Sequence, residues 1–313
     1  MRRSLEETRA DQRFLRGLGR RTQSSTCTNA WTNTWNLMIC FVKAFRDLLM
    51  NLPLCRIAFV SAVLSGLLAA SPLTMARSDA PVLAVASVLQ FAVVEIAEAF
   101  KAETGMEVRL SFGSTGNFTR QIRQGAPFEL FIAADEQFIA GLHADGFTLD
   151  AGALYAVGRV VIMVPHGSDL TPDSHLDQLA QMLAEGRLER FAIANPDHAP
   201  YGMRAREALI RKGIWEDLLP AMVFGENVAQ AAQFTLSGNA DGGIIAYSLA
   251  LAPEVSPRGT FALIPESWHE PLRQRMALLP DAGKVAKAFY AYMQEASARE
   301  IMTRYGFDLP AGH

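Results

Sequence analysis

The sequence has very little cysteine, and all of it lies near one end. Cys27, Cys40 and Cys55 precede residue 77, and residues 77–313 contain none. This absence excludes disulfides, cysteine-based zinc sites and a thiol nucleophile from most of the chain. It does not exclude export, because a chain of this length can bury a large core without disulfides.

Motifs of common enzyme classes are also missing. Gly113-Ser114-Thr115-Gly116 lacks the Gly-x-Ser-x-Gly spacing of a nucleophile elbow. There is no Gly-x-Gly-x-x-Gly or Walker A motif, and no His-x-x-x-His pair for a metal. Asp197-His198 could suggest acid/base work, but a turn-forming Asp beside a surface or capping His is the simpler interpretation. We therefore expect no enzymatic activity, no catalytic residue and no cofactor.

Basic charge is scarce in the same region. Residues 77–313 carry 19 Lys and Arg against 28 Asp and Glu, a net charge of −9, whereas the whole chain averages −3. Such an acidic body repels phosphate backbones, so we expect no nucleic-acid partner. A small anion would have to be held by local dipoles.

An uncharged apolar run occupies residues 57–70 and follows Arg56. Its length and flanks are typical of a signal peptide, which we place at 50–76, with cleavage after Ala76 or Ala80. A buried core helix is the alternative. No lipobox follows the run. Residues 1–49 are interpreted as a non-native or disordered extension, because Met50 stands where a signal peptide would begin.

From residue 81 onward, short apolar runs alternate with amphipathic stretches, which predicts an α/β fold with parallel sheets. The length suggests two lobes, residues 81–157 completed by about 273–313, and residues 158–264. Strands crossing near Val157–Val161 and Phe261–Leu278 would join them. We expect strands at Val82–Ala86, Glu107–Phe112, Phe128–Ala133, Val160–Val164, Arg190–Ala194, Ala221–Phe224 and Gly243–Tyr247. We expect helices at Leu89–Glu103, Phe118–Arg123, Glu136–Ala144, Leu176–Ala184, Met203–Lys212, Val228–Leu236, Lys284–Glu295 and Ala298–Tyr305.

Four predicted strand-to-helix junctions are rich in small or hydroxylic residues. Ligands of open α/β sheets bind at the carboxyl ends of strands, against helix N-termini whose N–H groups are free. An oxyanion requires several such donors in a dry cleft. Simple helix capping is the alternative at each junction, and sequence spacing alone cannot show that the junctions converge. The four junctions are residues 86–88, 112–117, 195–202 and 225–228.

These residues resemble a known family, the periplasmic molybdate-binding proteins (ModA type) of ABC transporters. The resemblance covers about residues 81–310 and implies a two-lobed, type II-like periplasmic-binding-protein (Venus-flytrap) fold with the anion between the lobes. The segments that carry the resemblance are Ser111–Gly116 followed by Gln121-Ile122, Gly125–Pro127, Phe131–Asp135, Asn195–Gly202 and Tyr305–Phe307.

The resemblance also implies the ligand donors. These would be the hydroxyls of Ser87 and Thr115 and the backbone N–H groups of Val88, Thr115, Tyr201 and Val228, with Ser114 replacing Thr115 if the loop is shifted by one residue. Two positions depart from the family. Val88 stands where one branch has Asn, and Ala246 where another branch has a ligand tyrosine. Tyr247 follows Ala246, but adjacent residues of a strand point to opposite faces.

The implied function is capture of molybdate or tungstate outside the cytoplasm, in the periplasm, for an ABC importer. The expected partners are that anion and the transporter permease, and we expect a monomer whose only metal is part of the oxyanion. The predicted site offers only hydrogen-bond donors, whereas phosphate requires an acceptor for its own proton. Sulfate has no such proton, so only the size of the cleft could exclude it. There are two alternative functions: a binding protein for sulfate or phosphate, and an effector-sensing domain of a regulator.

Overall fold

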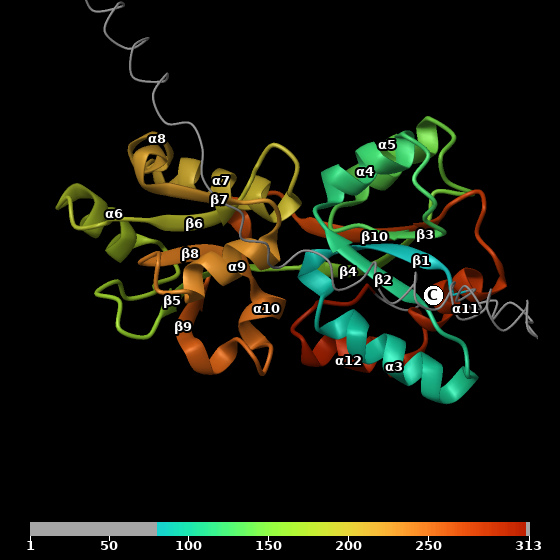
Figure 1. Cartoon of the computed structure of the whole chain (residues 1–313). Helices are drawn as coiled ribbons and strands as arrows, with labels where there is room; N and C mark the ends of the chain where they lie inside the picture. Colours follow the sequence, from blue (N-terminus) through green and yellow to red (C-terminus); the bar gives the residue numbers. More distant parts are fainter. Residues whose placement is uncertain (1–79, 311–313) are drawn as a thin grey trace, which may run out of the picture. The chain divides into compact units, whose positions relative to one another are not determined.

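The computed structural model describes residues 80–310; the expected extension 1–49 and signal peptide 50–76 lie outside the described residues. Two five-stranded sheets organise this part of the chain, and helices cover both faces of each sheet (Figure 1). Within residues 80–310, none of the helices combines the length and the apolar character that crossing a membrane requires.

The first sheet has the strand order β2-β1-β3-β10-β4. Strands β1, β2 and β3 run parallel, and β10 pairs antiparallel with both β3 and β4. The short 3-10 helix η2 (Ser87–Leu89) follows β1 directly. The strands are β1 (Val82–Ala86), β2 (Arg109–Gly113), β3 (Leu130–Ile132), β4 (Ala153–Gly158) and β10 (Leu272–Leu278).

Helices pack on both faces of this sheet because side chains alternate along its strands. Leu83 and Val85 of β1 face the cluster that holds Phe100 and Phe289, whereas Ala84 faces a second cluster with Phe118. Helices α3 and α12 therefore lie on one face, and α4 and α5 on the other (Figure 1). The helices of this lobe are α3 (Ala92–Thr104), α4 (Thr115–Arg123), α5 (Glu136–Ala144), α11 (Lys284–Tyr292) and α12 (Ala296–Arg304).

The second sheet repeats the same plan with the order β7-β6-β8-β5-β9. Here β6, β7 and β8 run parallel, and β5 pairs antiparallel with β8 and β9. Its strands are β5 (Val160–Pro165), β6 (Phe191–Ala194), β7 (Met222–Gly225), β8 (Gly242–Ala246) and β9 (Gly259–Leu263). Its helices are α6 (Asp177–Ala184), α7 (Pro200–Lys212), α8 (Trp215–Leu218), α9 (Val228–Leu236) and α10 (Tyr247–Leu251), with 3-10 helices η3 (Leu219–Ala221), η4 (Ser256–Arg258) and η5 (Glu266–Trp268).

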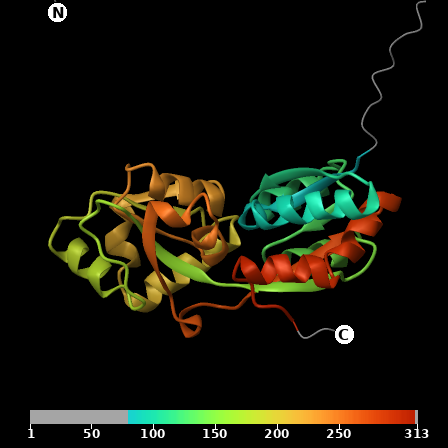
Figure 2. The same ribbon diagram turned by 90° about the horizontal axis from the view of Figure 1, so that it is seen from below.

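The chain crosses between the sheets twice. Strand β4 of the first sheet ends at Gly158 and β5 of the second begins at Val160, so that one residue separates them (Figure 2). Residues 264–271 lead back from β9 to β10. The predicted two-lobed α/β fold is confirmed, but the prediction of parallel sheets is wrong in part: both sheets are mixed, because the crossing strands β5 and β10 pair antiparallel with their neighbours.

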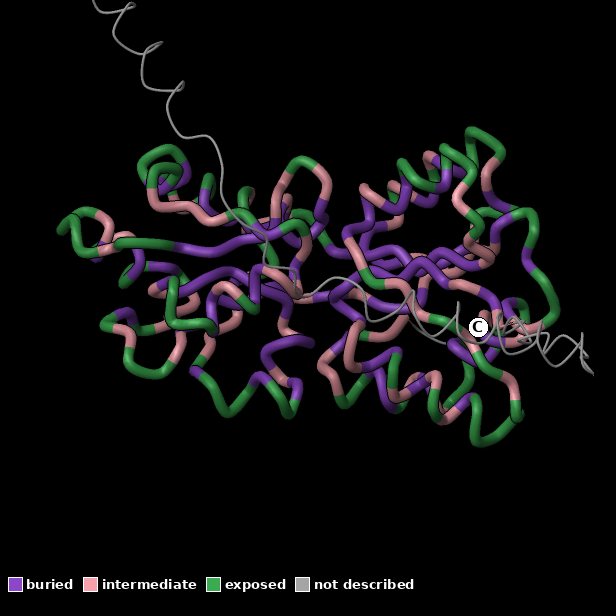
Figure 3. Tube along the Cα trace, viewed as in Figure 1, coloured by how far each residue is buried: buried purple, intermediate pink, exposed green. Residues whose placement is uncertain are grey.

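The inner parallel strands β1, β3, β6 and β8 are buried along nearly their whole length, whereas the edge strands β2 and β7 are partly exposed (Figure 3). Strands β1 and β2 lead into η2 and α4, and β6 and β7 lead into α7 and α9. In a sheet of this kind, the carboxyl ends of parallel strands meet at one edge. The topology therefore collects two helix starts from each lobe at the edges where ligands of α/β proteins bind.

Candidate functional site

A small cavity lies where these helix starts meet. The space open to the centre of a water molecule is about 10 Å³, close to the roughly 10–15 Å³ that one water requires. The cavity is therefore small. All six predicted ligand residues line it: Ser87, Val88, Ser114, Thr115, Tyr201 and Val228. The other lining residues are Ala86, Gly113, Ala134, Ala199, Pro200 and Asn227.

Helix α4 begins at this cavity with its first turn already capped. The Ser114 hydroxyl accepts a hydrogen bond from the N–H of Asn117 at 3.3 Å, and the N–H of Gly116 donates to the carbonyl of His198 at 2.9 Å. The N–H of Phe118 bonds to the carbonyl of Ser114. Because a helix start has free N–H groups, these bonds leave the N–H of Thr115 for the cavity.

The Thr115 hydroxyl is oriented by the backbone beside it. Its oxygen accepts a hydrogen bond from the N–H of Ala134 at 3.0 Å. A hydroxyl has one proton and two lone pairs, so this contact occupies an acceptor position and leaves the proton to donate. Thr115 is fully buried. Its hydroxyl and N–H can therefore both donate to one ligand.

Helix α9 begins on the other lobe in the same way. Asn227 caps it, and its side-chain oxygen accepts from the N–H groups of Ala229 and Gln230 at 3.1 and 3.0 Å. The N–H of Ala231 bonds to the carbonyl of Asn227. Of the first-turn donors, the N–H of Val228 is the one left to face the cavity.

Helix α7 supplies the N–H of Tyr201 in its first turn, directly after Pro200. The phenol of Tyr201 serves another purpose, because its oxygen accepts from the Gln274 amide at 2.9 Å. Burial raises the pKa of the Tyr201 phenol, so it stays neutral. A side chain at Gly158 would place its Cβ 2.1 Å from this oxygen, and the ring is thus wedged against the start of the crossing. The phenol contact holds the start of α7 in place beside the cavity.

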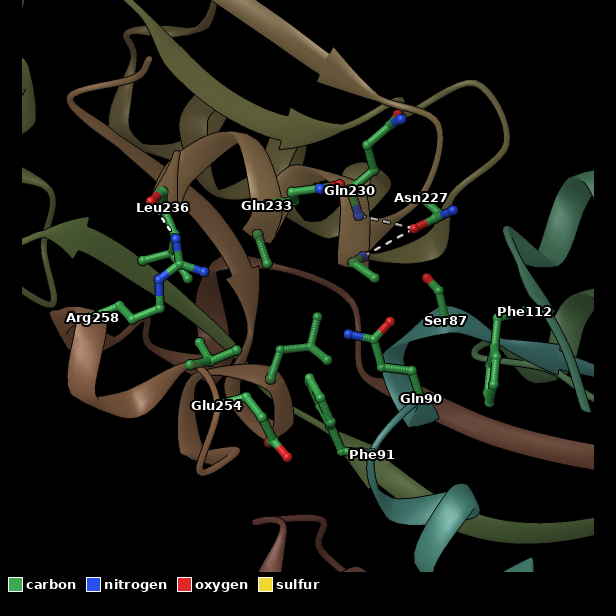
Figure 4. Close-up of a pocket in the computed structure, with 14 residues that line it drawn as sticks. Ser87, Gln90, Phe91, Phe112, Asn227, Gln230, Gln233, Leu236, Glu254 and Arg258 are labelled. Carbon is green, nitrogen blue, oxygen red and sulfur yellow. Dashed lines mark hydrogen bonds between the residues drawn. The ribbon is translucent and has the colours of Figure 1, made fainter. Parts of the chain in front are cut away.

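The fourth contribution comes from η2, which carries Ser87 and Val88. The Val88 carbonyl accepts from the Ser248 hydroxyl of the other lobe at 3.2 Å. Ser87 lies between the small cavity and a larger neighbouring pocket, where it and Gln90 face Asn227 and Gln230 across the gap (Figure 4). That pocket has a volume of about 500 Å³ and adjoins the small cavity on its Ser87 side.

None of the residues that line the cavity is charged. The starts of α4, α7 and α9 each carry roughly half a positive charge from the helix dipole. Together with the hydroxyls, they make the cavity electropositive without a cation. Among residues 80–310 there is no cluster of three or more His, Cys, Asp or Glu side chains that could hold a metal ion. The arrangement is suited to a small anion that accepts hydrogen bonds.

Side chains around the cavity join the two lobes. Asp135 caps α5 and bonds to Arg204 of α7 at 2.8 Å, with both side chains about 95% buried. Asn117 of α4 donates to the carboxylate of Glu226 at 2.8 Å. The Nδ1 atom of His198 lies 2.9 Å from the Ser114 hydroxyl. All three contacts require the lobes to be in contact.

Comparisons with known proteins agree with this geometry. The family model described as "Bacterial extracellular solute-binding protein" matches residues 81–308. The chain belongs to this family. A molybdate-binding protein ModA of Rhodobacter capsulatus is 33% identical over 216 residues, covering 68% of this chain and 82% of the relative. The ModA of Escherichia coli K12 is 34% identical, covering 72% and 87%.

Solved structures of such solute-binding proteins share the fold. The periplasmic molybdate-binding protein of Azotobacter vinelandii has a TM-score of 0.66 and 28% identity, and the match covers 74% of this chain and 99% of that one. A sulfate-binding protein of Mycobacterium tuberculosis has a TM-score of 0.62 at 17% identity, and this likeness shows the fold alone.

Two side chains of this solute-binding protein make contacts that the sequence-based interpretation did not include. Helical spacing alone leaves open whether Arg204 lies on a solvated face or borders a cleft, and in the structure it is buried against Asp135. His198 was expected at the surface or as a cap, but it is half-buried and contacts Ser114 across the lobes. Both roles depend on contacts between the lobes, of Arg204 with Asp135 and of His198 with Ser114, which sequence spacing does not reveal.

The structure also places Ala246 and Val88, the two positions that depart from the family pattern. Ala246 ends β8 and is buried, and it does not line the cavity. Tyr247 is the first residue of α10 and not a strand residue, and its ring packs edge-on against Phe261 with centroids 5.7 Å apart. Val88 lines the cavity, and its side chain has no group that can donate a hydrogen bond.

Proposed function

We propose that this protein captures molybdate or tungstate in the cavity between its lobes. The donors are the hydroxyls of Ser87 and Thr115 and the N–H groups of Val88, Thr115, Tyr201 and Val228, and Ser114 completes the set. The observation that carries this proposal is convergence: residues from four separate helix starts line one buried, uncharged cavity. Relatives that are named molybdate-binding proteins support the choice of anion.

The donor set explains why the ligand is a fully deprotonated oxyanion. Molybdate and tungstate are dianions at neutral pH and accept a hydrogen bond from every donor. Removing a doubly charged ion from water is costly unless such donors replace its hydration shell. Preorganised N–H groups at helix starts need no reorientation for this purpose. Phosphate carries a proton of its own and requires an acceptor, which the N–H groups of this set cannot provide.

Binding would couple to lobe closure. Ser87, Val88, Ser114 and Thr115 belong to the first lobe, and Tyr201 and Val228 to the second. A ligand that contacts both lobes stabilises the arrangement in which they touch. The closed protein then delivers the anion, in the periplasm, to the permease of an ABC importer, and it acts as a monomer without a cofactor.

Isothermal titration calorimetry of the purified protein with molybdate, tungstate, sulfate and phosphate tests the proposal. We expect molybdate and tungstate to bind with one site per chain and to bind far more tightly than phosphate. Sulfate is also a pure acceptor, so its affinity measures how strictly the cavity selects by size. If none of the four anions gives a heat of binding, the proposal is wrong. Tight binding of sulfate with weak molybdate binding would reassign the ligand.

A further inference from the structure

His198 makes two contacts with the start of α4, although it belongs to the opposite lobe. Its carbonyl accepts from the N–H of Gly116 at 2.9 Å, and its ring Nδ1 lies 2.9 Å from the Ser114 hydroxyl. The two backbones approach so closely that a Cβ on Gly116 would lie 2.6 Å from the His198 carbonyl oxygen. The ring of His198 is thereby held against Ser114 whenever the lobes touch.

A hydrogen-bond inventory of Ser114 shows what this ring controls. The hydroxyl has one proton and two lone pairs, and the N–H of Asn117 uses one lone pair. If Nδ1 of His198 carries a hydrogen, it donates to the second lone pair, and the Ser114 proton is free to point into the cavity. If Nδ1 is bare, it takes the Ser114 proton, and a lone pair faces the ligand instead.

We propose that His198 is a positioning residue that sets Ser114 as a donor to the bound oxyanion, through a hydrogen bond that forms when the lobes close. This inference rests on the proposed function. A ligand that only accepts hydrogen bonds selects the ring form with a hydrogen on Nδ1. The protonated ring has a hydrogen on both nitrogens and fixes Ser114 in the same orientation. His198 itself lies outside the cavity lining and does not touch the ligand.

The surroundings of His198 determine how the ring responds to pH. Burial lowers the pKa of His198 below its usual value, and the nearby Arg120 of α4 lowers it further. Glu226, which precedes α9, and the adjacent Asp197 act in the opposite direction. The free protein therefore holds a neutral ring near pH 7. Because an anion on Ser114 favours the protonated ring, anion binding should take up a proton as the pH falls.

Molybdate affinity measured by calorimetry between about pH 5.5 and pH 8 tests the inference. In the unmodified protein, the affinity should increase as the pH falls through the pKa of His198. His198→Asn keeps an N–H near the position of Nδ1 but does not titrate. Its molybdate affinity at pH 8 should stay within a few-fold of that of the unmodified protein. The increase in affinity at lower pH that depends on His198 should be absent. His198→Phe lacks the donor and should bind about tenfold more weakly at every pH, which corresponds to about 1.4 kcal/mol.

Any pH effect on molybdate itself is common to all three proteins and cancels between them. If His198→Phe retains the affinity and pH profile of the unmodified protein, the inference is wrong. If that variant does not fold, the comparison of His198→Asn with the unmodified protein decides, and identical profiles would refute the role of His198. Absence of oxyanion binding by the unmodified protein would instead defeat the proposed function.

Discussion

Thr115 shows at the scale of one residue how the backbone can orient a hydroxyl at the cavity. The Ala134 N–H occupies its oxygen, and the proton remains for the cavity. Thr115→Val has the same shape but no hydroxyl, so it should weaken molybdate binding by about 1.5–3 kcal/mol, the range for hydrogen bonds to charged groups. Thr115→Ser keeps the hydroxyl and is the matched control. Calorimetry on both variants measures the difference, and equal affinities would remove the Thr115 hydroxyl from the donor set.

Tyr201 contributes to the site through its backbone, and its phenol makes a separate contact. Tyr201→Phe should therefore leave the molybdate affinity nearly unchanged. The protein should still lose about 1–3 kcal/mol of unfolding free energy, because the buried Gln274 amide loses its acceptor. Denaturant unfolding and calorimetry separate the two effects. A large loss of affinity with little loss of stability would assign the phenol to the ligand.

At the scale of elements, the starts of α5 and α7 are joined by Asp135 and Arg204. Opening the lobes separates this pair, so it favours the closed arrangement even before a ligand binds. Arg204→Met leaves the buried carboxylate of Asp135 unpaired, which is expensive. We expect at least tenfold weaker molybdate binding and a larger radius of gyration in small-angle X-ray scattering.

Two further variants complete this test. Arg211→Met removes an exposed charge from the same helix and should change neither quantity. Combining Arg204→Met with Asp135→Asn removes both charges and should recover part of the affinity, because no buried charge is then unpaired. A double variant that binds no better than Arg204→Met would mean that Arg204 acts through packing and not through its charge.

At the scale of the whole molecule, ligand binding and stability are linked. A ligand present at 100 times its Kd stabilises the native state by about 2.7 kcal/mol. For a body of this size, that corresponds to an increase in Tm of roughly 5–10 °C. Molybdate and tungstate should produce this shift in a thermal unfolding assay, and phosphate should not. A similar shift with phosphate would show that the cavity contains an acceptor that the donor inventory overlooks.

The sequence predicted elements well where the pattern is local. Helices α5 and α9 and strand β1 have the predicted bounds, because apolar residues mark all three and a capping residue marks the start of each helix. Helices α4 and α7 begin three residues earlier than predicted, at Thr115 and Pro200. Those first turns lack apolar periodicity, and residues of both turns line the cavity.

The sequence by itself determined which residues could form the site: an α/β body without cysteine, four polar junctions after predicted strands, and six candidate donors. Local propensity and family resemblance suffice for these, because each depends on residues close together in the chain. Only the tertiary structure decided that the junctions meet, that Arg204 and His198 reach across the lobes, and that the cavity is small and uncharged. These properties depend on which distant segments pack together, and no short-range pattern encodes that packing.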